Sequence, residues 1–392
     1  MTTMKEKAYA IAGEIRDFRH DFHMYPEIGF HEFRTAGIIG DTLKKLGYRV
    51  QRNVARTGVL GEKGKGSPVI AIRADIDALP IEEKNDLPYA STIPGMMHAC
   101  GHDAHTAIAL GVAHLLSEEE FPGTVRFLFQ PSEDNGDEED ISGAPRMLEA
   151  GALEGVDAIL GLHVMADLPR GKIFTIPGAV LSGADVFTAS VLGKGGHTAS
   201  PYQAIDPIYI TSLVIQAIYS IVPRSVPAYK RGVIALGIVH GGTKDGVIPE
   251  KVDLAGIYRY TDSDSREAIH SGLEKALAIS RSFGGDYALD VHTAAPATIN
   301  NPKITETVLQ VTEDLFGKEH IGEYKPLPYG DDFAYFAEKV PACYFMLGAG
   351  IEGDLRRHHD PHFDIDESIL PIGAAIIAES SLRLLRGDLD FA

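Results

Sequence analysis

Hydrophobic and polar positions in the first part of the chain follow two alternating patterns. Short apolar runs of strand length are separated by longer segments in which apolar residues recur every three or four positions, as in an amphipathic helix. The strand-like runs are residues 68–75, 125–130 and 158–164, and the helix-like segments are residues 5–23, 32–46 and 105–116. Strands that alternate with helices predict an α/β layer with a largely parallel sheet.

The middle of the chain has a different order of elements. Its pattern predicts strand, helix, strand, strand, helix and strand, at residues 186–192, 205–221, 233–240, 252–260, 265–283 and 287–292. This is the βαββαβ order of a ferredoxin-like unit. The α/β pattern then returns and ends in a helix over residues 370–385. We therefore predict a two-domain chain, in which residues 1–184 and 297–392 form one α/β domain and residues 185–296 form a smaller inserted domain.

The composition narrows the classes of partner and compartment. The chain has 392 residues, 44% of them hydrophobic, and a formal net charge of -19. An acidic surface repels nucleic acids and anionic membranes, so neither is expected as a partner. Two cysteines in a chain of this length form no disulfide framework, which favours a reducing compartment. Residues 1–27 lack the apolar core of a signal peptide, and no apolar run approaches the ~18 residues of a membrane span, so we expect a cytoplasmic protein.

The strongest chemical signal is the segment Met97–His105, which precedes a predicted helix. Cys100 and His102 flank one glycine, and His98 and His105 lie on either side of them. Thiolate and imidazole groups are strong ligands for zinc and similar divalent ions. A buried cysteine is usually a small hydrophobic residue, and a single histidine is usually a surface or hydrogen-bonded core residue. Four such groups within eight residues favour a metal site over these alternatives.

Three further positions could complete such a site. Glu133 and Asp134 follow the strand that ends at Gln130, and one of two adjacent carboxylates can bind metal while the other acts as a base. His163 interrupts an apolar strand, and three histidines lie within residues 356–362. In an open α/β sheet, the loops at the carboxyl ends of the strands share one edge, where ligands bind. Taken singly, the three positions are also compatible with a solvated acidic loop, a core histidine and a polar surface loop.

Two other segments offer groups that would support catalysis. Asp75 and Asp77 end a predicted strand, where a carboxylate could accept a hydrogen bond from a ligand histidine and fix its tautomer. The glycine-rich residues 193–196 precede His197. They lack the Walker pattern of a phosphate loop, and they would let the backbone turn tightly and present His197 as a donor to an oxyanion. An ordinary tight turn with a surface histidine is the alternative.

Signatures of other enzyme classes are absent from the sequence. It contains no Gly-x-Ser-x-Gly elbow of a serine hydrolase, and no Gly-x-Gly-x-x-Gly follows the first strand as a dinucleotide site requires. No Cys-x-x-Cys accompanies Cys100, which argues against a redox role. The metal site therefore remains the strongest chemical signal in the sequence.

These segments resemble the signature motifs of the M20 metallopeptidase family, in its amidohydrolase branch. That branch includes hippurate hydrolases, acetyl-diaminopimelate deacetylases, aminoacylase-like enzymes and auxin-conjugate hydrolases. The resemblance covers nearly the whole chain. It rests on Arg19–His23, Pro26–Phe30, Arg73–Pro80, His98–His105, Phe129–Pro131, Gly161–His163, Gly195–His197, Asp331–Phe333 and His359–Pro361.

The resemblance implies a zinc-peptidase-like catalytic domain with two divalent metal ions per subunit, and a lid domain over residues 185–296 that mediates dimerisation. By position it implies five metal ligands, with the thiol in the bridging place: Cys100, His102, Asp134, His163 and His359. Glu133 matches the general base, His197 the lid histidine that reaches the substrate carbonyl, and Asp75 the carboxylate behind the ligands. Zinc or manganese suits this ligand set, and nickel and cobalt are further candidates.

The reaction that the resemblance implies is hydrolysis of the amide bond of an N-acyl amino acid, which releases a carboxylic acid and a free amino acid. It also implies a homodimer or higher oligomer through the lid domain. Three features depart from the family pattern. Asp134 stands where the family usually has glutamate, and the acidic residues 135–140 replace a glycine-rich loop. Gly246 stands where the family usually has an asparagine that helps to bind the substrate carboxylate. A dipeptidase or carboxypeptidase of the same family is one alternative function. A metal-binding relative that has lost turnover is another.

Overall fold

The computed structural model describes residues 2–387, and the chain falls into two units. The first unit comprises Met1–Val180, Ile299–Lys325 and Asp332–Ala392, and the second comprises Leu181–Thr298 and Pro326–Asp331. The domain predicted at residues 185–296 falls within the second unit, to which a short segment before Asp332 also belongs. Residue 1 and residues 388–392, at the two ends of the predicted α/β domain, lie outside the described residues.

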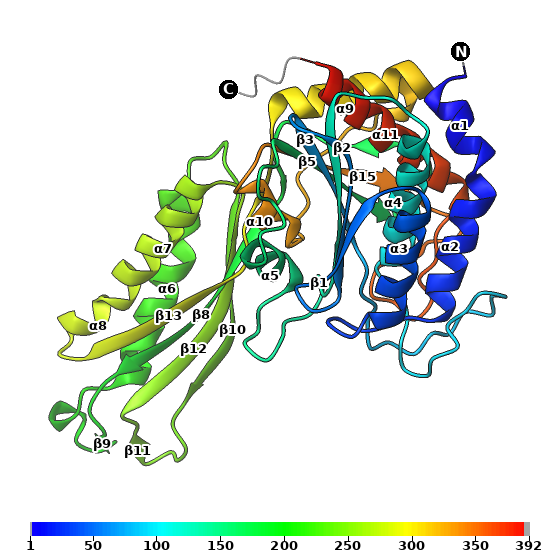
Figure 1. Cartoon of the computed structure of the whole chain (residues 1–392). Helices are drawn as coiled ribbons and strands as arrows, with labels where there is room; N and C mark the ends of the chain where they lie inside the picture. Colours follow the sequence, from blue (N-terminus) through cyan, green and yellow to red (C-terminus); the bar gives the residue numbers. More distant parts are fainter. Residues whose placement is uncertain (1, 388–392) are drawn as a thin grey trace. The chain divides into compact units, whose positions relative to one another are not determined.

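A seven-stranded sheet forms the centre of the first unit (Figure 1), in the order β1-β2-β4-β3-β5-β15-β6. The four inner strands β4, β3, β5 and β15 are parallel, whereas β1, β2 and β6 pair antiparallel with their neighbours at the two edges. The strands span Arg49–Val54 (β1), Gly58–Lys65 (β2), Val69–Asp75 (β3), Gly123–Gln130 (β4), Ala158–Met165 (β5), Ile173–Phe174 (β6) and Ala342–Gly348 (β15). The predicted α/β fold with parallel central strands is confirmed.

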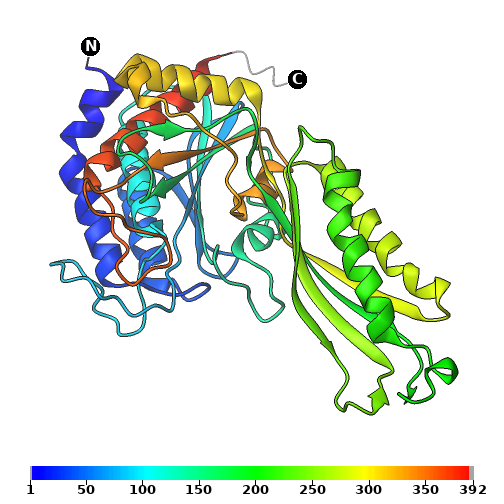
Figure 2. The same ribbon diagram turned by 180° about the vertical axis from the view of Figure 1, so that it is seen from behind.

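Helices cover both faces of this sheet, as Figures 1 and 2 show from opposite sides. The helices α3, α4 and α11 lie on one face, and the shorter α5 and α10 lie on the other. The bounds are Met4–Ala10 (α1), Ala12–Met24 (α2), Phe33–Lys45 (α3), His102–Ser117 (α4), Gly143–Glu149 (α5), Pro302–Phe316 (α9), Phe333–Ala337 (α10) and Leu370–Arg386 (α11). Apolar residues of α4 and α11 share one core with Ile70, Ile72 and Ala74 of β3. Burial of this apolar surface holds the first turn of α4 against the end of β3.

The segment Glu367–Arg386, which contains α11, corrects one expectation from the sequence. By length and composition it is long and apolar enough to cross a membrane, although no run of that kind was expected. In the structure 83% of its apolar window is buried inside the protein. Its apolar composition is therefore that of a core helix, which is hydrophobic on nearly every side because protein surrounds it.

Two helix boundaries differ from those that apolar periodicity predicts. Helix α4 begins at His102 rather than at His105, because the N–H groups of Ala104 and His105 donate to the carbonyl of Gly101, which adopts φ 89°. The first turn of α4 is polar, so apolar periodicity alone does not show it. The predicted helix over residues 5–23 is divided into α1 and α2 at Ile11, whose φ and ψ of -102° and 10° interrupt the helix. Because α4 begins at His102, both His102 and His105 lie on its first helical turn.

The second unit consists of a four-stranded antiparallel sheet in the order β10-β12-β8-β13. Its main elements are Gly183–Leu192 (β8), Pro207–Ser225 (α6), Gly232–Gly241 (β10), Lys251–Tyr260 (β12), Ser263–Leu277 (α7) and Asp286–Ala295 (β13). Helices α6 and α7 lie side by side on one face of the sheet in both ribbon views (Figures 1 and 2). This order is the predicted βαββαβ arrangement of a ferredoxin-like fold. Shorter elements are Gly178–Leu181 (β7), Gly196–His197 (β9), Val247–Ile248 (β11), Ile279–Ser282 (α8) and Thr298–Asn300 (β14).

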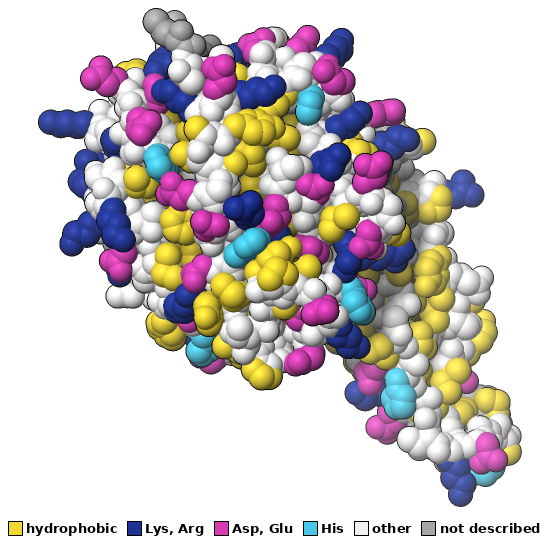
Figure 3. Space-filling view, turned by 90° about the vertical axis from the view of Figure 1, so that its right-hand side faces the viewer, with side chains coloured by type: hydrophobic (Ala, Val, Ile, Leu, Met, Phe, Trp, Pro, Cys, Tyr) yellow, Lys and Arg dark blue, Asp and Glu magenta, His cyan; other side chains and the backbone are white. Residues whose placement is uncertain are grey.

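The surface of the first unit around α1 and α2 carries charges of both signs. Figure 3 shows Lys and Arg interspersed with Asp and Glu on this face, and the hydrophobic side chains there form separate groups. A nucleic-acid interface would need basic side chains gathered in one patch or stripe. The face that Figure 3 shows does not have this distribution, which agrees with the formal net charge of -19.

Candidate metal centre

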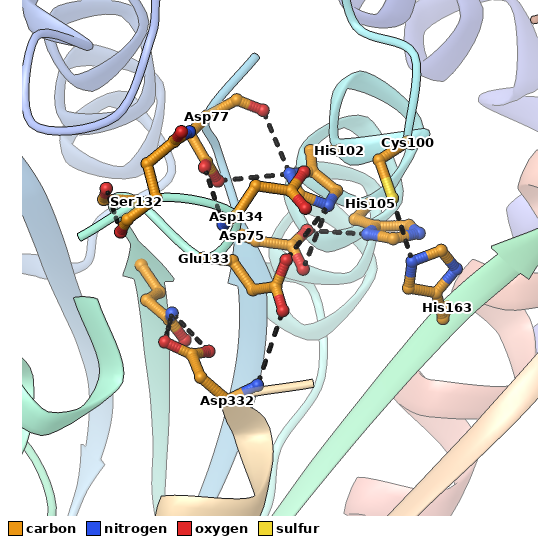
Figure 4. Close-up of polar contacts among 12 residues, drawn as sticks. Asp75, Asp77, Cys100, His102, His105, Ser132, Glu133, Asp134, His163 and Asp332 are labelled. Carbon is orange, nitrogen blue, oxygen red and sulfur yellow. Dashed lines mark hydrogen bonds and ion pairs between the residues drawn. The ribbon is translucent and has the colours of Figure 1, made fainter. Parts of the chain in front are cut away.

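Several separate segments of the first unit bring polar side chains to one edge of the sheet (Figure 4). Strand β3 ends at Asp75, β4 ends at Gln130 shortly before Glu133, and His163 lies near the end of β5. Because these strands are parallel, their carboxyl ends share one edge, and α4 begins beside them at His102. The side chains predicted to carry the chemistry therefore come from strand ends and from the segments that follow them.

The five candidate ligands form two groups that share Cys100. One donor atom each of Cys100, His102 and His163 lie within 4.8 Å of one another, and so do donor atoms of Cys100, Asp134 and His359. The Sγ atom of Cys100 lies 3.5 Å from Nε2 of His163. The Oδ1 atom of Asp134 lies 3.4 Å from Nε2 of His359. The structure thus brings together all five residues that the sequence predicts as ligands, with the thiol common to both groups.

The ring of His102 is oriented by Asp77. Its Nδ1 lies 3.0 Å from the carbonyl oxygen of Asp77 and 3.1 Å from Oδ1 of the same residue, both of them acceptors, so Nδ1 carries a proton. Its Nε2 is buried and makes no hydrogen bond to the described residues. A buried ring nitrogen needs a partner, and a metal ion held together with Cys100 and His163 would supply one once this nitrogen has lost its proton.

His105 is a supporting residue, because both of its ring nitrogens are engaged. The backbone N–H of Val164 donates to Nε2 at 2.9 Å, so Nδ1 carries the proton that points at Oδ1 of Asp75, 2.6 Å away. The Asp75 carboxylate therefore contacts His105 directly, whereas its Oδ2 is 3.8 Å from Nε2 of His102. His98 is also buried, and neither of its ring nitrogens makes a hydrogen bond to the described residues.

The adjacent carboxylates of Glu133 and Asp134 lie on a turn that is fixed at both ends. Ser132 adopts φ 49°, and its backbone N–H donates to Oε1 of the buried Glu32 at 2.9 Å. The backbone N–H of Asp134 donates to Oδ2 of Asp77 at 3.1 Å. On this turn Asp134 belongs to a donor group, whereas Glu133 belongs to neither of the two groups that share the thiol. The two carboxylates are therefore placed for different roles.

Among the three late histidines, His359 is the one that reaches the donor groups. It adopts φ 59°, and its backbone N–H donates to the carbonyl of Ala99 at 2.8 Å. His358 is half-buried and packs instead against His163, with ring centroids 5.2 Å apart, and its Nε2 accepts from the backbone N–H of Ala166 at 3.3 Å. The side chain of His362 is 57% exposed. Because His359 has a left-handed backbone, its ring and the ring of His358 point in different directions.

Burial sets the protonation states of the candidate ligands. Burial, reinforced by a neighbouring carboxylate, raises the pKa of the Cys100 thiol above its ordinary value. Burial, reinforced by neighbouring imidazoles, lowers the pKa of His163 well below its ordinary value, and burial also lowers the pKa of His359. Neutral imidazole is the form that binds a metal ion, and a thiol must lose its proton to do so. His163 and His359 are therefore in the form that binds a metal ion. Burial opposes protonation of His102, but the carboxylate of Asp75 outweighs it and raises the pKa of His102 well above its ordinary value. Binding at Cys100 and at His102 therefore releases protons.

A buried network behind the site was not predicted as functional from the sequence. The guanidinium of Arg73 donates to Oδ2 of Asp75 at 2.6 Å, to Oδ1 of Asp332 at 3.1 Å and to Oε1 of Gln130 at 2.8 Å. Burial opposes ionisation of Asp75, but Arg73 and two histidines outweigh it and hold the pKa of this carboxyl well below its usual range. A charged residue inside an apolar strand run was the signal that could have identified Arg73, since buried charges are paired.

His197 lies in the second unit, in a short strand pair with β11. Strand β9 places His197 opposite Val247, and the neighbouring Gly246 accepts a hydrogen bond at its carbonyl from the N–H of Thr198 at 3.3 Å. The exposed ring of His197 accepts at Nδ1 from the N–H of Ala199 at 3.0 Å. In its neutral form it therefore carries its proton on Nε2, which is a hydrogen-bond donor.

The donor set fits divalent transition-metal ions. Each group combines the thiol with imidazole nitrogen, and the second group adds a carboxylate oxygen. Sulfur and nitrogen donors suit zinc, and a site that includes a carboxylate also accepts manganese, nickel or cobalt. The orphaned Nε2 of His102 and the neutral imidazole of His163 agree with this chemistry.

Known proteins match the chain over most of its length. The family described as peptidase family M20/M25/M40 matches residues 71–383. The thermostable carboxypeptidase 1 of Saccharolobus solfataricus is 34% identical over 380 residues, which are 95% of each chain. The N-acetyl-L-cysteine deacetylase of Bacillus subtilis is 36% identical over 375 residues, which are 94% of this chain and 87% of that relative.

A solved structure shares the fold as well as the sequence. It is that of a Bacillus subtilis protein described as a dinuclear metal-binding peptidase from the M20 family. The TM-score is 0.83 at 32% identity, and the match covers 96% of this chain and 99% of that one. Two donor groups that share one thiol are an arrangement in which a pair of metal ions would fit.

Proposed function

The chain belongs to the peptidase family M20/M25/M40, and we propose that it hydrolyses the amide bond of N-acyl amino acids to a carboxylic acid and a free amino acid. It is a metal-dependent amidohydrolase, as the family and the named relatives indicate. The choice of N-acyl amino acids is supported by the deacetylase, whose name gives an N-acetyl amino acid as its substrate.

The observation that carries this proposal is the position of Glu133 beside the two donor groups. Its Oε2 lies 3.9 Å from Nε2 of His102, and it directly precedes Asp134 on the same turn. A carboxylate that is near the metal ligands without belonging to their groups can exchange a proton with a bound water. This placement distinguishes a hydrolase from a site that only stores metal.

Two divalent ions would be held by Cys100, His102, Asp134, His163 and His359. When bound, such ions supply Lewis-acid chemistry: they polarise a carbonyl group and lower the pKa of a bound water towards about 7. Asp77 orients His102, and Asp75 does the same for the supporting His105. These contacts hold the donor atoms in place before a substrate arrives.

Glu133 acts as the proton carrier of the reaction. It accepts a proton from the water that attacks the amide carbon, and it donates that proton to the nitrogen as the carbon–nitrogen bond breaks. One water is consumed, and one carboxylic acid and one amine are formed. We assign to His197 the hydrogen bond from Nε2–H to the oxygen that becomes negative during attack, because its Nδ1 is already an acceptor.

The metal, the partner and the cellular compartment are proposed together with the reaction. Zinc or manganese is the proposed metal, and nickel or cobalt would fit the same donors. The substrate is a small molecule, and the partner is a second copy of the chain bound through the second unit. The cytoplasm is the proposed compartment.

A second candidate function is that of a carboxypeptidase or dipeptidase. The relative named a thermostable carboxypeptidase, 34% identical over 95% of this chain, favours it. The family resemblance implies an asparagine at position 246 that helps to bind the substrate carboxylate, so with Gly246 that contact would differ from the family pattern. A panel of acetyl, benzoyl, longer-acyl and indole-acetyl amino acids, set against dipeptides and with each metal added back, separates the two functions.

The experiment that tests the base is E133Q. The variant is expected to bind the same amount of metal as the wild type and to lose turnover by about 100-fold or more, the usual contribution of a general base. Metal content is measured by elemental analysis, and turnover with the best substrate of the panel. Full activity of this variant would show that Glu133 is not the base.

A further inference from the structure

The carboxylate of Glu133 is held from the side that faces away from the candidate ligands. The backbone N–H of Asp332 donates to its Oε1 at 3.4 Å, while its Oε2 lies 3.9 Å from Nε2 of His102 (Figure 4). A separation of 3.4 Å is long for an N–H···O bond, as catalytic hydrogen bonds often are before a substrate binds. One oxygen is therefore tethered to the backbone, and the other faces the metal-binding side chains.

The side chain of Asp332 is fixed by several buried donors, so its backbone is fixed as well. It accepts hydrogen bonds from Nη2 of Arg73 at 3.1 Å, Nε2 of Gln130 at 2.7 Å, Oγ of Ser142 at 2.7 Å and the N–H of Ala144 at 2.9 Å. Asp332 is 4% exposed. These donors come from β3, β4 and the first turn of α5. Rotation of Asp332 would break several buried hydrogen bonds at once, each costly to leave unmade.

Arg73 extends the same network to the imidazole side of the site. Its Nη1 lies 2.6 Å from Oδ2 of Asp75, whose Oδ1 contacts His105. The guanidinium and the Asp75 carboxylate are both fully buried. One guanidinium thus binds two buried carboxylates in a low-dielectric interior, where such charge-assisted hydrogen bonds are strong and fix the geometry.

We propose that Asp332 is a positioning residue for amide hydrolysis, which acts through Glu133. Its buried carboxylate locks the backbone N–H of residue 332 against Oε1 and so directs Oε2 towards the reacting water. In this role Asp332 acts through Glu133 and not as a metal ligand. The inference rests on the proposed function, because it assumes that Glu133 is the base.

The substitution D332N tests the role with little change of shape. It leaves the buried pair of Arg73 and Asp75 with equal and opposite charges, so the variant is expected to fold. The amide group, however, places a donor against the donors of Gln130 or Ala144, which loosens residue 332. We expect kcat to fall by about 10- to 100-fold, because a base displaced by about 1 Å loses that much rate. KM is expected to stay within about threefold of the wild type and metal content to be unchanged, since neither the substrate contacts nor the ligands are altered.

The double variant E133Q/D332N separates positioning from a general structural role. If Asp332 acts through Glu133, the double variant turns over no more slowly than E133Q alone, within about twofold. If the two losses multiply, Asp332 acts elsewhere and the proposal is wrong. D185N is the matched control, because Asp185 is also a buried carboxylate, bonded to Arg266 at 2.7 Å in the second unit. It is expected to leave kcat near the wild-type value.

The outcomes also separate this inference from the proposed function. An inactive E133Q with a D332N variant of wild-type kcat refutes the positioning role and leaves the base assignment intact. A fully active E133Q refutes both. Loss of metal from D332N would show that Asp332 supports the ligands rather than the base, and it would also overturn the inference.

Discussion

The Oδ1 atom of Asp77 lies 3.1 Å from Nδ1 of His102, and Oδ2 of the same carboxylate accepts from the backbone N–H of Asp134 at 3.1 Å. One side chain therefore orients a candidate ligand from each donor group. An asparagine at this position can accept only one of the two hydrogen bonds. We expect D77N to weaken metal binding by about 10- to 100-fold, the usual cost of losing such a contact.

Metal affinity of D77N is measured by competition with a chelator at constant pH. Asp86, which is exposed, provides the control variant D86N, and its affinity should equal that of the wild type. An unaltered affinity in D77N would mean that the backbone alone holds His102 and Asp134 in position.

The second prediction concerns the late histidines. His359 belongs to the group with Cys100 and Asp134, whereas His362 is exposed beside Asp360. Loss of one of three donors in a group should remove the ion held there, so H359A is expected to bind about one equivalent of metal where the wild type binds two. H362A should bind as the wild type does. Elemental analysis after dialysis checks both, and two full equivalents in H359A would exclude this histidine as a ligand.

Gly101 provides a prediction about stability. It adopts φ 89°, and a Cβ added to it would lie 2.4 Å from Cγ2 of Val164. A side chain at this position costs roughly 1–2 kcal/mol for the left-handed backbone, and the collision adds to this. We expect G101A to lower the midpoint of thermal unfolding by roughly 5 °C and to displace Cys100 and His102.

The control for G101A is G13A. An added Cβ meets nothing within 4 Å at Gly13, which lies on the exposed side of α2. Alanine is more favourable than glycine in a helix by about 1 kcal/mol, so G13A should unfold at a slightly higher temperature than the wild type. Equal midpoints for G101A and the wild type would mean that β5 moves aside without cost.

His23 makes stability depend on pH in the alkaline range. Burial opposes its protonation, but Asp103, whose Oδ2 lies 2.8 Å from Nδ1, outweighs burial and raises the pKa of His23 to about 9. The ordinary value is about 6.5. A raised pKa in the folded state stabilises it fully below pH 6.5, and this contribution declines as the pH rises and is lost above about 9. The shift corresponds to a contribution on the order of 3 kcal/mol.

The prediction is tested by the unfolding midpoint of the metal-free protein between pH 6 and 10. The wild type should lose more stability over this range than H23Q, whose glutamine does not titrate. Parallel curves for the two proteins would show that the imidazole stays neutral in the fold.

The elements that the sequence predicts well are those with a strong local pattern. The strands that end at Asp75 and Gln130, and the βαββαβ order of the second unit, follow from apolar runs and their spacing. Cys100 and His102 are identified because they are close together in the chain. His98 and His105 could be assigned supporting roles only by the resemblance, and the structure gives the physical reason for His105 in its two engaged nitrogens.

Other features depend on contacts between distant residues. Arg73 and Asp332 are 259 residues apart in the chain, so no local pattern connects them. Asp75 and Asp77 are two positions apart, and only the path of the chain after β3 decides that Asp77 contacts His102. The choice of His359 among its neighbours depends on a left-handed backbone that sequence periodicity does not show.

The division of labour between the two units has an evolutionary consequence. Every candidate metal ligand, the candidate base and the groups that orient them come from residues of the first unit, whereas His197 and Gly246 come from the inserted one. Under the proposed function, mutations in the second unit would act on the hydrogen bond of His197 and on the substrate contact at Gly246, whereas the metal ligands and the base are encoded in other parts of the chain. Under the proposed function, selection on substrate specificity and selection on metal binding would therefore act on different segments of the gene.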